Sequence, residues 1–338
     1  MNPIVISHSD DLDGIAAGAM VRMRYGVPLD RIFYTDYTKE RRDDVARQIR
    51  KLDLKDADLF VLDLNPDPDG TFLGIIDAVK KNGGRVFWLD HHPWSKAAIR
   101  KIASRCDVAV VGENRKFCAT EIAIRHFGLK GRFIRKLART VHYSDFNITP
   151  RGKEYRKLVK AYALGISYYN MICSPETGTK KLRLLASQLA EGRLVSRELA
   201  SAARKFEKVN SRRVGKMLAD LHLVGETIAV GFSRGVQATM ACGEIIRKSN
   251  RDIAFCISTE KGKASMRSVK SDITGLAVSF GGGGHPHAAG FEVDTKRYNL
   301  ATKKGRRRLI RQIEENAGRL GLLGGAMGQA GRKQPKNS

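Results

Sequence analysis

The chain has 338 residues, of which 42% are hydrophobic and 28% are charged. This length leaves room for a buried core and favours two domains, and the composition excludes a disordered or fibrous chain. The formal net charge of +26 is unusual. Such a positive field attracts phosphate-rich partners, although adaptation of a whole proteome to salt or temperature gives the same excess, and charge alone leaves both explanations open.

The five cysteines are widely spread, and no two of them form a C-x-x-C pair. The pattern indicates neither a thiolate zinc site nor a disulfide framework, so we expect small buried thiols in a reducing compartment. The N-terminus enters a strand-like segment without the basic and long apolar regions of a signal peptide. No apolar span reaches about 18 residues, so we expect no transmembrane helix, no membrane partner and a cytoplasmic location.

In chain order, strand and helix patterns alternate over residues 1–90. Apolar segments predict strands at residues 4–7, 31–35, 57–62 and 85–89, and amphipathic segments predict helices at 15–25, at 39–52 and from Asp69-Gly70 onwards. Gly26-Val27-Pro28 ends the first helix and Asn82-Gly83-Gly84 the third, where glycine permits a left-handed end. This alternation predicts a parallel sheet covered by helices on both faces, with ligands outside the carboxyl ends of its strands.

The rest of the chain predicts a helical stretch followed by a second α/β unit. The helices are expected at 118–127, 131–141, 154–164 and 181–209, and the second unit has strands at 227–232, 252–258, 264–268 and 289–293 with helices at 242–248, 273–280 and 306–320. We therefore expect a first domain at 1–180, a basic helical linker at 181–225, a second domain at 226–322 and a disordered tail at 323–338.

Carboxylates and histidines follow three of the first four predicted strands. The run His8-Ser9-Asp10-Asp11-Leu12-Asp13-Gly14 follows the first strand, Asp63 the third, and Asp90-His91-His92 the fourth. Oxygen donors mixed with imidazole suit Mn²⁺ or Mg²⁺ better than a closed zinc site. Two such ions about 3.5–4 Å apart, bridged by Asp63, would form a centre that cleaves phosphoesters.

Each cluster taken alone also has a plainer interpretation. A D-x-D-G run makes turns and helix N-caps, and a lone Asp63 can do the same. His91 and His92 can be a surface pair on a turn, although two unpaired histidines at the end of a buried strand are hard to explain by packing. Asp36 also ends a strand, and we expect it to cap a helix or support the ligands.

Together with Asp145 in His142-Tyr143-Ser144-Asp145-Phe146, these runs resemble in order the four motifs of the DHH phosphoesterase superfamily. That superfamily includes RecJ-like exonucleases, oligoribonucleases, cyclic dinucleotide phosphodiesterases and family II inorganic pyrophosphatases. The run from Gly281 to Gly290 resembles the glycine-histidine signature of the DHH-associated domain. The resemblance covers about residues 1–295 and implies an enzyme with an N-terminal, parallel-sheet, Rossmann-like domain and a smaller C-terminal α/β domain.

The resemblance also implies two Mn²⁺ sites that share one carboxylate. The implied ligands are His8, Asp11 and Asp63 for the first ion and Asp13, Asp63, His91 and Asp145 for the second. Asp90 would orient the histidines, and His92 would contact the scissile phosphate while a metal-activated hydroxide attacks phosphorus in line. Two residues separate His8 from Asp11 where the family often has one or three, so Asp10 is an alternative to Asp11.

In the second domain, Gly281-Gly282-Gly283-Gly284 allow the backbone to approach an anion, and their N–H groups can form a nest. For glycines alone, a flexible loop is the simpler interpretation. The resemblance implies contacts with substrate phosphate or base, and Arg267 can grip a distal phosphate with two hydrogen bonds. For His287, packing is the alternative to a substrate contact. The residues expected to bind substrate are Arg267, Ser265, Gly283, Gly284 and His285.

These inferences predict a Mn²⁺-dependent phosphodiesterase, with Mg²⁺ as the other candidate cation, that hydrolyses short oligonucleotides or single-stranded nucleic acid. Cyclic dinucleotides, 3′-phosphoadenosine 5′-phosphate and polyphosphate are the alternative substrates. Family II pyrophosphatase activity is disfavoured because that subgroup lacks the glycine-histidine run. A catalytically degenerate protein that binds single strands is the alternative of another class. The choice between RNA and DNA, the polarity of cleavage, and monomer or homodimer stay open.

Overall fold

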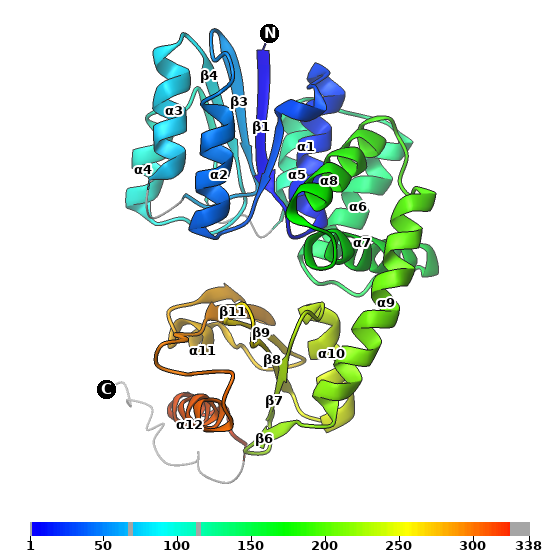
Figure 1. Cartoon of the computed structure of the whole chain (residues 1–338), viewed down its shortest axis with the longest axis vertical. Helices are drawn as coiled ribbons and strands as arrows, with labels where there is room; N and C mark the ends of the chain where they lie inside the picture. The colour runs from blue at the N-terminus through cyan, green and yellow to red at the C-terminus, as the bar shows by residue number, and fades with distance from the viewer. Residues whose placement is uncertain (1, 67–69, 113–115, 325–338) are drawn as a thin grey trace, which may run out of the picture. The chain divides into compact units, whose positions relative to one another are not determined.

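The structure is a computed structural model that describes residues 2–66, 70–112 and 116–324 (Figure 1). The chain forms two compact units, Met1–Phe206 and Glu207–Ser338, and each is described by itself. Most of the predicted disordered tail lies outside the described residues. Among the residues that are described, no helix combines the length and the apolar character that crossing a bilayer requires.

Unit 1 is built on a five-stranded parallel sheet with the strand order β2-β1-β3-β4-β5. Its central strands are buried because helices cover both faces, as in other parallel sheets. The strands are β1 (Asn2–His8), β2 (Ile32–Thr35), β3 (Ala57–Leu62), β4 (Arg85–Leu89) and β5 (Val108–Val110).

Two layers of helices enclose this sheet (Figure 1). On one face, α1 (Leu12–Tyr25) and α5 (Ala119–His126) share a core with Phe60 and Leu62 of β3. On the other face, α2 (Lys39–Ile49), α3 (Thr71–Lys81) and α4 (Lys96–Ala103) share a core with Leu59 and Val61. Consecutive residues of β3 thus point into opposite layers, as the period of a strand requires.

The start of α1 positions the first cluster of acidic residues. The Asp11 carboxylate accepts hydrogen bonds from the backbone N–H groups of Asp13, at 3.0 Å, and Gly14, at 3.3 Å, and so caps the helix. The helix ends at Gly26, which has a φ of 66°. It begins at Leu12 rather than at the predicted Ile15, so Asp13 lies in the first helical turn.

Three further helices complete unit 1, and one helix leads out of it. The three helices are α6 (Arg132–Asp145), α7 (Lys153–Met171) and α8 (Pro175–Ala190). The boundary between the two units falls within the next helix, α9 (Arg197–Leu218). A short 3₁₀ turn, Leu29–Arg31, precedes β2. Leu182, Leu185 and Leu189 of α8 are buried in the same core as α1. The segment predicted as a linker therefore includes a helix that belongs to the core of unit 1.

Unit 2 contains a six-stranded mixed sheet with the order β10-β11-β9-β8-β7-β6, in which only β7 and β8 pair in parallel. Helix α10 (Ala238–Ser249) packs on one face, and α11 (Thr274–Val278) and α12 (Lys303–Arg319) pack on the other. The predicted fold class, a parallel-sheet unit followed by a second α/β unit, is confirmed. The strands are β6 (His222–Val224), β7 (Ile228–Ser233), β8 (Ile253–Ser258), β9 (Lys263–Ser268), β10 (Gly283–His285) and β11 (Ala288–Glu292).

The glycine run of unit 2 is partly a strand rather than wholly a loop. Gly283 and Gly284 belong to β10 and pair with Gly290 and Ala289 of β11. A Cβ atom at Gly282 would lie 2.1 Å from the Gly290 carbonyl oxygen, and one at Gly284 would lie 2.6 Å from the Ala288 carbonyl oxygen. Close backbone packing thus requires glycine at both positions. The two interpretations of the sequence, an anion-binding nest and a flexible loop, did not include this reason.

Candidate metal centre

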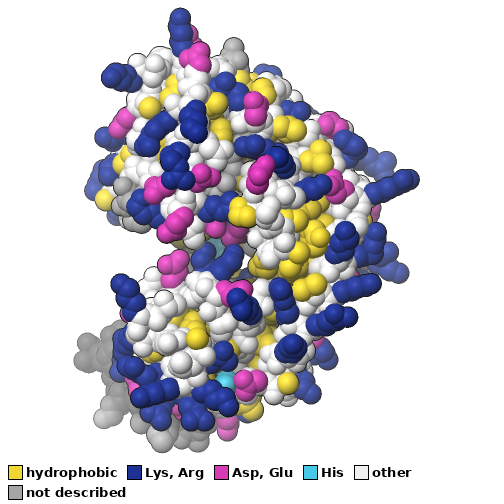
Figure 2. Space-filling model, in the orientation of Figure 1, with side chains coloured by type: hydrophobic (Ala, Val, Ile, Leu, Met, Phe, Trp, Pro, Cys, Tyr) yellow, Lys and Arg dark blue, Asp and Glu magenta, His cyan; other side chains and the backbone are white. Residues whose placement is uncertain are grey.

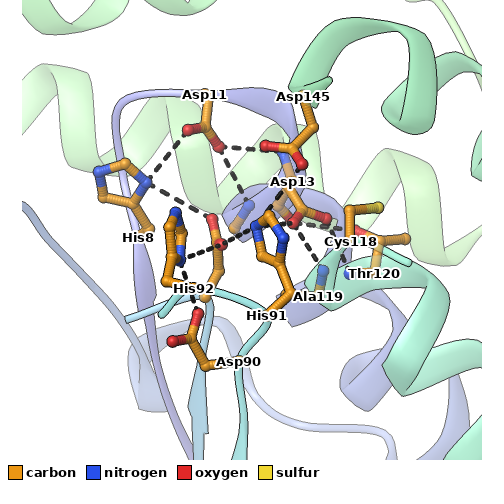
Figure 3. A network of polar contacts seen from close by, with 12 residues as sticks. His8, Asp11, Asp13, Asp90, His91, His92, Cys118, Ala119, Thr120 and Asp145 are labelled. Carbon is orange, nitrogen blue, oxygen red and sulfur yellow. Dashed lines mark hydrogen bonds and ion pairs between the residues drawn. The ribbon is translucent and has the colours of Figure 1, made fainter. Parts of the chain in front are cut away.

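Carboxylates and imidazoles from distant parts of unit 1 meet at the carboxyl edge of its parallel sheet (Figure 3). They come from the end of β1, the start of α1, the segments after β3 and β4, and the last turn of α6. Their donor atoms form three overlapping groups, each within 4.8 Å: His8, Asp11 and Asp63; Asp13, His91 and Asp145; and Asp63, His91 and His92. The structure therefore brings together all six residues that the resemblance implies as ligands.

Asp63 belongs to two of the three groups and lies between His8 and His91. Its Oδ2 atom lies 3.5 Å from His8 Nδ1, and its Oδ1 atom lies 3.6 Å from His91 Nε2. The backbone of Asp63 has a φ of 55°, which turns the chain directly after β3, and residues other than glycine rarely adopt this conformation. Each oxygen of one carboxylate thus faces a different group of donors.

The remaining distances complete the two outer groups. His8 Nδ1 lies 3.2 Å from Asp11 Oδ2. His91 Nε2 lies 3.8 Å from Asp13 Oδ2 and 3.5 Å from Asp145 Oδ2. The exposed Asp10 instead accepts a hydrogen bond from the Ser9 hydroxyl at 3.1 Å, so this arrangement favours Asp11 over Asp10.

Asp13 is held by the N-terminus of α5, which no sequence motif indicated. The Ala119 N–H donates to Asp13 Oδ2 and the Thr120 N–H donates to Asp13 Oδ1, both at 2.7 Å (Figure 3). The Thr120 hydroxyl donates to the Asp13 carbonyl oxygen at 2.9 Å. Because the first N–H groups of a helix carry a partial positive charge, α5 both orients the Asp13 carboxylate and stabilises its negative charge.

The buried carboxylates are close enough to repel one another. Burial and the neighbouring Asp13 and Asp11 carboxylates raise the pKa of Asp63 well above its ordinary value. Burial and Asp13 likewise raise the pKa of Asp145. Burial lowers the pKa of His8, but Asp11 and Asp63 outweigh it, and this pKa is raised overall. A cation that is shared by these groups would remove the repulsion.

Several polar atoms of the site have no hydrogen-bond partner in the described part of the chain. These buried, unpartnered atoms include both carboxylate oxygens of Asp63, both ring nitrogens of His91, and Asp145 Oδ2. Buried polar atoms in proteins are normally hydrogen-bonded, and orphaned ones need an explanation. Since carboxylate oxygens are ligands of both Mn²⁺ and Mg²⁺, and imidazole nitrogens are ligands of transition-metal ions, these residues fit a centre that holds divalent cations.

Asp90 and His92 form a pair beside these groups. Asp90 Oδ1 lies 2.8 Å from His92 Nδ1, and Trp94 Nε1 donates to Asp90 Oδ2 at 2.6 Å. Burial would raise the pKa of Asp90, but its bonds to His92 and Trp94 lower it. No hydrogen bond joins Asp90 to His91 among the described residues, so Asp90 orients His92 directly. The His92 side chain is 29% exposed whereas that of His91 is 1% exposed, so His92 is the histidine that reaches solvent.

Two residues after β2, Asp36 and Tyr37, lie near the donor groups. Asp36 Oδ1 accepts a hydrogen bond from the Thr38 N–H at 2.8 Å and so forms a turn before α2, but Thr38 is the N-cap residue and no side chain caps this helix, so the predicted capping role is wrong. The Tyr37 ring lies 5.0 Å from the His8 ring and was not predicted. The only signal that could have indicated Tyr37 was its place after the β2 strand, at the same edge of the sheet.

Of the substrate-binding residues predicted in unit 2, Arg267, Ser265, Gly283 and His285 lie together on one face of its sheet, and Gly284 alternates to the other face. Across β10, β11 and β9, one row of paired residues is His285, Ala288 and Arg267, and another is Gly283, Gly290 and Ser265. These two rows lie two residues apart along the strands and are therefore neighbours on the same face. The Arg267 guanidinium donates to Thr239 Oγ1 at 2.9 Å and to the Met266 carbonyl oxygen at 2.8 Å, and its buried Nε has no partner among the described residues. His287 Nδ1 lies 3.0 Å from Ser268 Oγ.

We expect the contact between α5 and Asp13 to control metal affinity. Ala119→Pro replaces the N–H that faces Asp13 with a ring carbon, yet proline is favoured at the first position of a helix, so α5 is preserved while the Asp13 carboxylate is displaced. Mn²⁺ affinity measured by calorimetry should fall by roughly 10–100-fold. Lys96→Pro, at the first position of α4, is the matched control and should leave affinity unchanged. Equal affinity in both variants would contradict the role given to α5.

The raised pKa values of Asp63 and Asp145 predict opposite effects of pH with and without metal. A carboxyl whose pKa is higher in the folded than in the unfolded chain favours folding when protonated, so this stabilisation is lost as pH rises above about 4. Cations bind the deprotonated groups. The increase in Tm on adding Mn²⁺ should therefore grow between about pH 5.5 and about pH 8, and Asp63→Asn should flatten this dependence. A pH-independent increase in the natural protein would be the contrary result.

Comparison with known proteins matches part of the second unit to a family model and most of the chain to the folds of solved structures. Residues 226–312 match the family model of the DHHA1 domain. The fold is similar to that of the pGpG-specific phosphodiesterase PggH from Vibrio cholerae, with a TM-score of 0.52, 12% identity, and coverage of 94% of this chain and 100% of that one. It is also similar to RecJ from Thermus thermophilus in complex with Mn²⁺, with a TM-score of 0.52, 16% identity, and coverage of 93% of this chain and 52% of RecJ. The curated protein sequences give no match.

The fold and the comparisons together define the architecture: a parallel-sheet first unit and a second, mixed-sheet unit, in a fold similar to those of the PggH phosphodiesterase and RecJ. The resemblance to the DHH-associated domain is confirmed over residues 226–312 by the DHHA1 match, and the fold of the chain is similar to those of PggH and RecJ.

Proposed function

We propose that this chain hydrolyses phosphodiester bonds in short oligonucleotides or single-stranded nucleic acid, with two divalent cations held at the candidate metal centre. The position of Asp63 is the observation that carries the proposal, because its two oxygens lie 3.5 Å and 3.6 Å from histidine nitrogens of different donor groups. A carboxylate in that position is suited to bridge two ions. Mn²⁺ is the proposed cation and Mg²⁺ the alternative, since the donors mix imidazole with carboxylate.

The distances between donor atoms divide the proposed ligands into two sets, one for each ion. His8, Asp11 and Asp63 would hold one ion, and Asp13, Asp63, His91 and Asp145 would hold the other. Two bound ions supply a nucleophilic water at neutral pH and neutralise charge that develops on the phosphate. The α5 N-terminus would keep Asp13 in place, and the Asp90 contact would fix the ring of His92, leaving its Nε2 atom to bind the scissile phosphate.

In unit 2, we propose that Arg267, Ser265, Gly283, Gly284 and His285 contact the distal part of the substrate. Support comes from the face of the sheet that Arg267, Ser265, Gly283 and His285 share, next to the backbone of Gly284, and from the unpartnered Nε of Arg267 in the described part of the chain. A guanidinium whose donors are incompletely used has capacity for an anion.

A substrate panel with Mn²⁺ tests the proposal directly. The panel contains RNA and DNA from di- to decanucleotides, pGpG, cyclic dinucleotides, 3′-phosphoadenosine 5′-phosphate and polyphosphate, and product release is measured with and without a chelator. Chelator-sensitive release of mononucleotides from linear strands supports the proposal. Turnover confined to the cyclic or small substrates would move the function to those alternatives, and strand binding without any turnover would favour a degenerate binding protein.

A further inference from the structure

Helix α6 carries a cationic face that its packing does not require. Arg132, Arg135, Lys136 and Arg139 follow one another at intervals of three, one and three residues, which places them on one side of the helix. The opposite side packs into the core of unit 1 through residues such as Leu137 and Val141, which are buried. Lys and Arg side chains cover much of the face shown in Figure 2, so a local arrangement is needed to single out a binding site.

That local arrangement is a cavity between α6 and α7. The cavity has a volume of about 810 Å³, and the four cationic side chains line it together with the rings of Tyr143 and Tyr155 and the side chain of Ile148. The two tyrosine rings lie 5.5 Å apart, nearly perpendicular. A space lined by both cations and aromatic rings has the features that bind single-stranded nucleic acid, because phosphates meet the cations and bases stack on the rings.

The positive charge of the cavity is only partly compensated within the described part of the chain. Lys136 forms an ion pair with Glu154, and the Arg139 guanidinium lies 5.9 Å from the Tyr155 ring. The exposed guanidinium groups of Arg132 and Arg135 form no hydrogen bond or ion pair with described residues. The other acidic residue at the cavity, Glu121, is already bound to His142 at 2.9 Å.

The same helix connects the cavity to the candidate metal centre. His142, which lines the cavity, contacts the Phe146 ring at 4.7 Å, and Phe146 contacts the His91 ring at 5.8 Å. Asp145, in the last turn of α6, belongs to the donor group of His91. Along the helix axis, Arg139 lies about 9 Å and Arg132 about 20 Å from Asp145. The cations thus extend along the helix away from the metal centre, on the side opposite to Asp145, which follows the buried Val141 by four residues.

We propose that this cavity binds the phosphate backbone and a base of a single-stranded polynucleotide, several nucleotides away from the bond that is cleaved. A linear dinucleotide with its internucleotide phosphate at the metals has no further linkage that reaches Arg132, and polyphosphate has no base to stack on Tyr143 or Tyr155. The cavity therefore makes longer strands the preferred substrate. This inference deepens the proposed function and rests on it for the reaction, but the binding itself is measured without turnover.

The test is the double variant Arg132→Ala/Arg135→Ala of the full chain. Its binding to a fluorescently labelled single-stranded 12-mer, of RNA and of DNA, is measured by anisotropy in the presence of a chelator. We expect binding about 10-fold weaker, and a log–log salt slope reduced by about 1.4, since each lost phosphate contact removes about 0.7. Arg132→Lys/Arg135→Lys should restore most of the binding. The control Arg307→Ala/Arg311→Ala removes two exposed charges from α12 and should bind like the natural protein.

Cleavage of a dinucleotide with Mn²⁺ separates this inference from the proposed function. The Arg132→Ala/Arg135→Ala variant should keep kcat/KM for the dinucleotide within about twofold and lose kcat/KM for the 12-mer in proportion to its weaker binding. Strand binding equal to that of the control variant, or an equal loss on both substrates, overturns the inference. If the cavity binds strands but no substrate is hydrolysed, the inference stands and the proposed hydrolysis fails.

Discussion

Asp63→Asn should abolish hydrolysis while leaving the metal-free protein at least as stable as the natural one. The amide keeps the shape of the side chain but cannot bridge two cations, so we expect kcat/KM to fall by about 10³-fold or more, which corresponds to about 4 kcal/mol of transition-state stabilisation. Because burial and nearby carboxylates raise the pKa of Asp63, removing its charge relieves repulsion in the metal-free fold. Thermal unfolding without metal and steady-state kinetics with Mn²⁺ measure the two effects.

Asp10→Asn is the matched control for this change, since Asp10 is exposed two positions from His8 and outside the donor groups. We expect it to keep near-normal turnover, whereas Asp11→Asn should lower it strongly. The reverse result would assign the first ion to Asp10. Near-normal turnover of Asp63→Asn would refute the bridging role itself.

His91→Gln should remove one of the two ions and most of the activity. The His91 side chain is 1% exposed and lies within 3.8 Å of three carboxylates, Asp13, Asp63 and Asp145, so glutamine fills similar space but replaces a strong imidazole donor. We expect calorimetry to give one bound Mn²⁺ per chain in place of two, and kcat/KM to fall by about 10³-fold.

His8→Gln should have the complementary effect, since it removes a donor of the other group. His126→Gln, at an exposed position on α5, is the control and should bind two ions. Two ions bound at unchanged affinity in both His91→Gln and His8→Gln would show that these histidines are not ligands.

The gathering of donors at one edge could be predicted from the sequence because it follows from topology. Short apolar runs predict strands, their alternation with amphipathic helices predicts a parallel sheet, and parallel strands present their carboxyl ends at a common edge. His8 ends β1, and Asp63 and His91 follow the adjacent strands β3 and β4, so the proximity of the three residues needs only the strand order. Asp145 required the family motif, because α6 reaches the site through tertiary packing.

The support behind these donors could not be predicted. The hydrogen bonds from Ala119 and Thr120 to Asp13 join residues 106 and 107 positions apart, and no local pattern encodes such a contact. The left-handed backbone of Asp63 likewise depends on tertiary surroundings rather than on propensity. Helix α4 and strand β5 were not predicted, since α4 buries only Ile102 and β5 has three residues, too few for a periodic signal.

The position of Mn²⁺ in crystals of the natural protein, determined from its anomalous scattering, tests the central claim most directly. We predict two peaks about 3.5–4 Å apart at the carboxyl edge of the parallel sheet, each within bonding distance of one oxygen of Asp63. A single peak, or peaks that Asp63 does not contact, would contradict the dinuclear site.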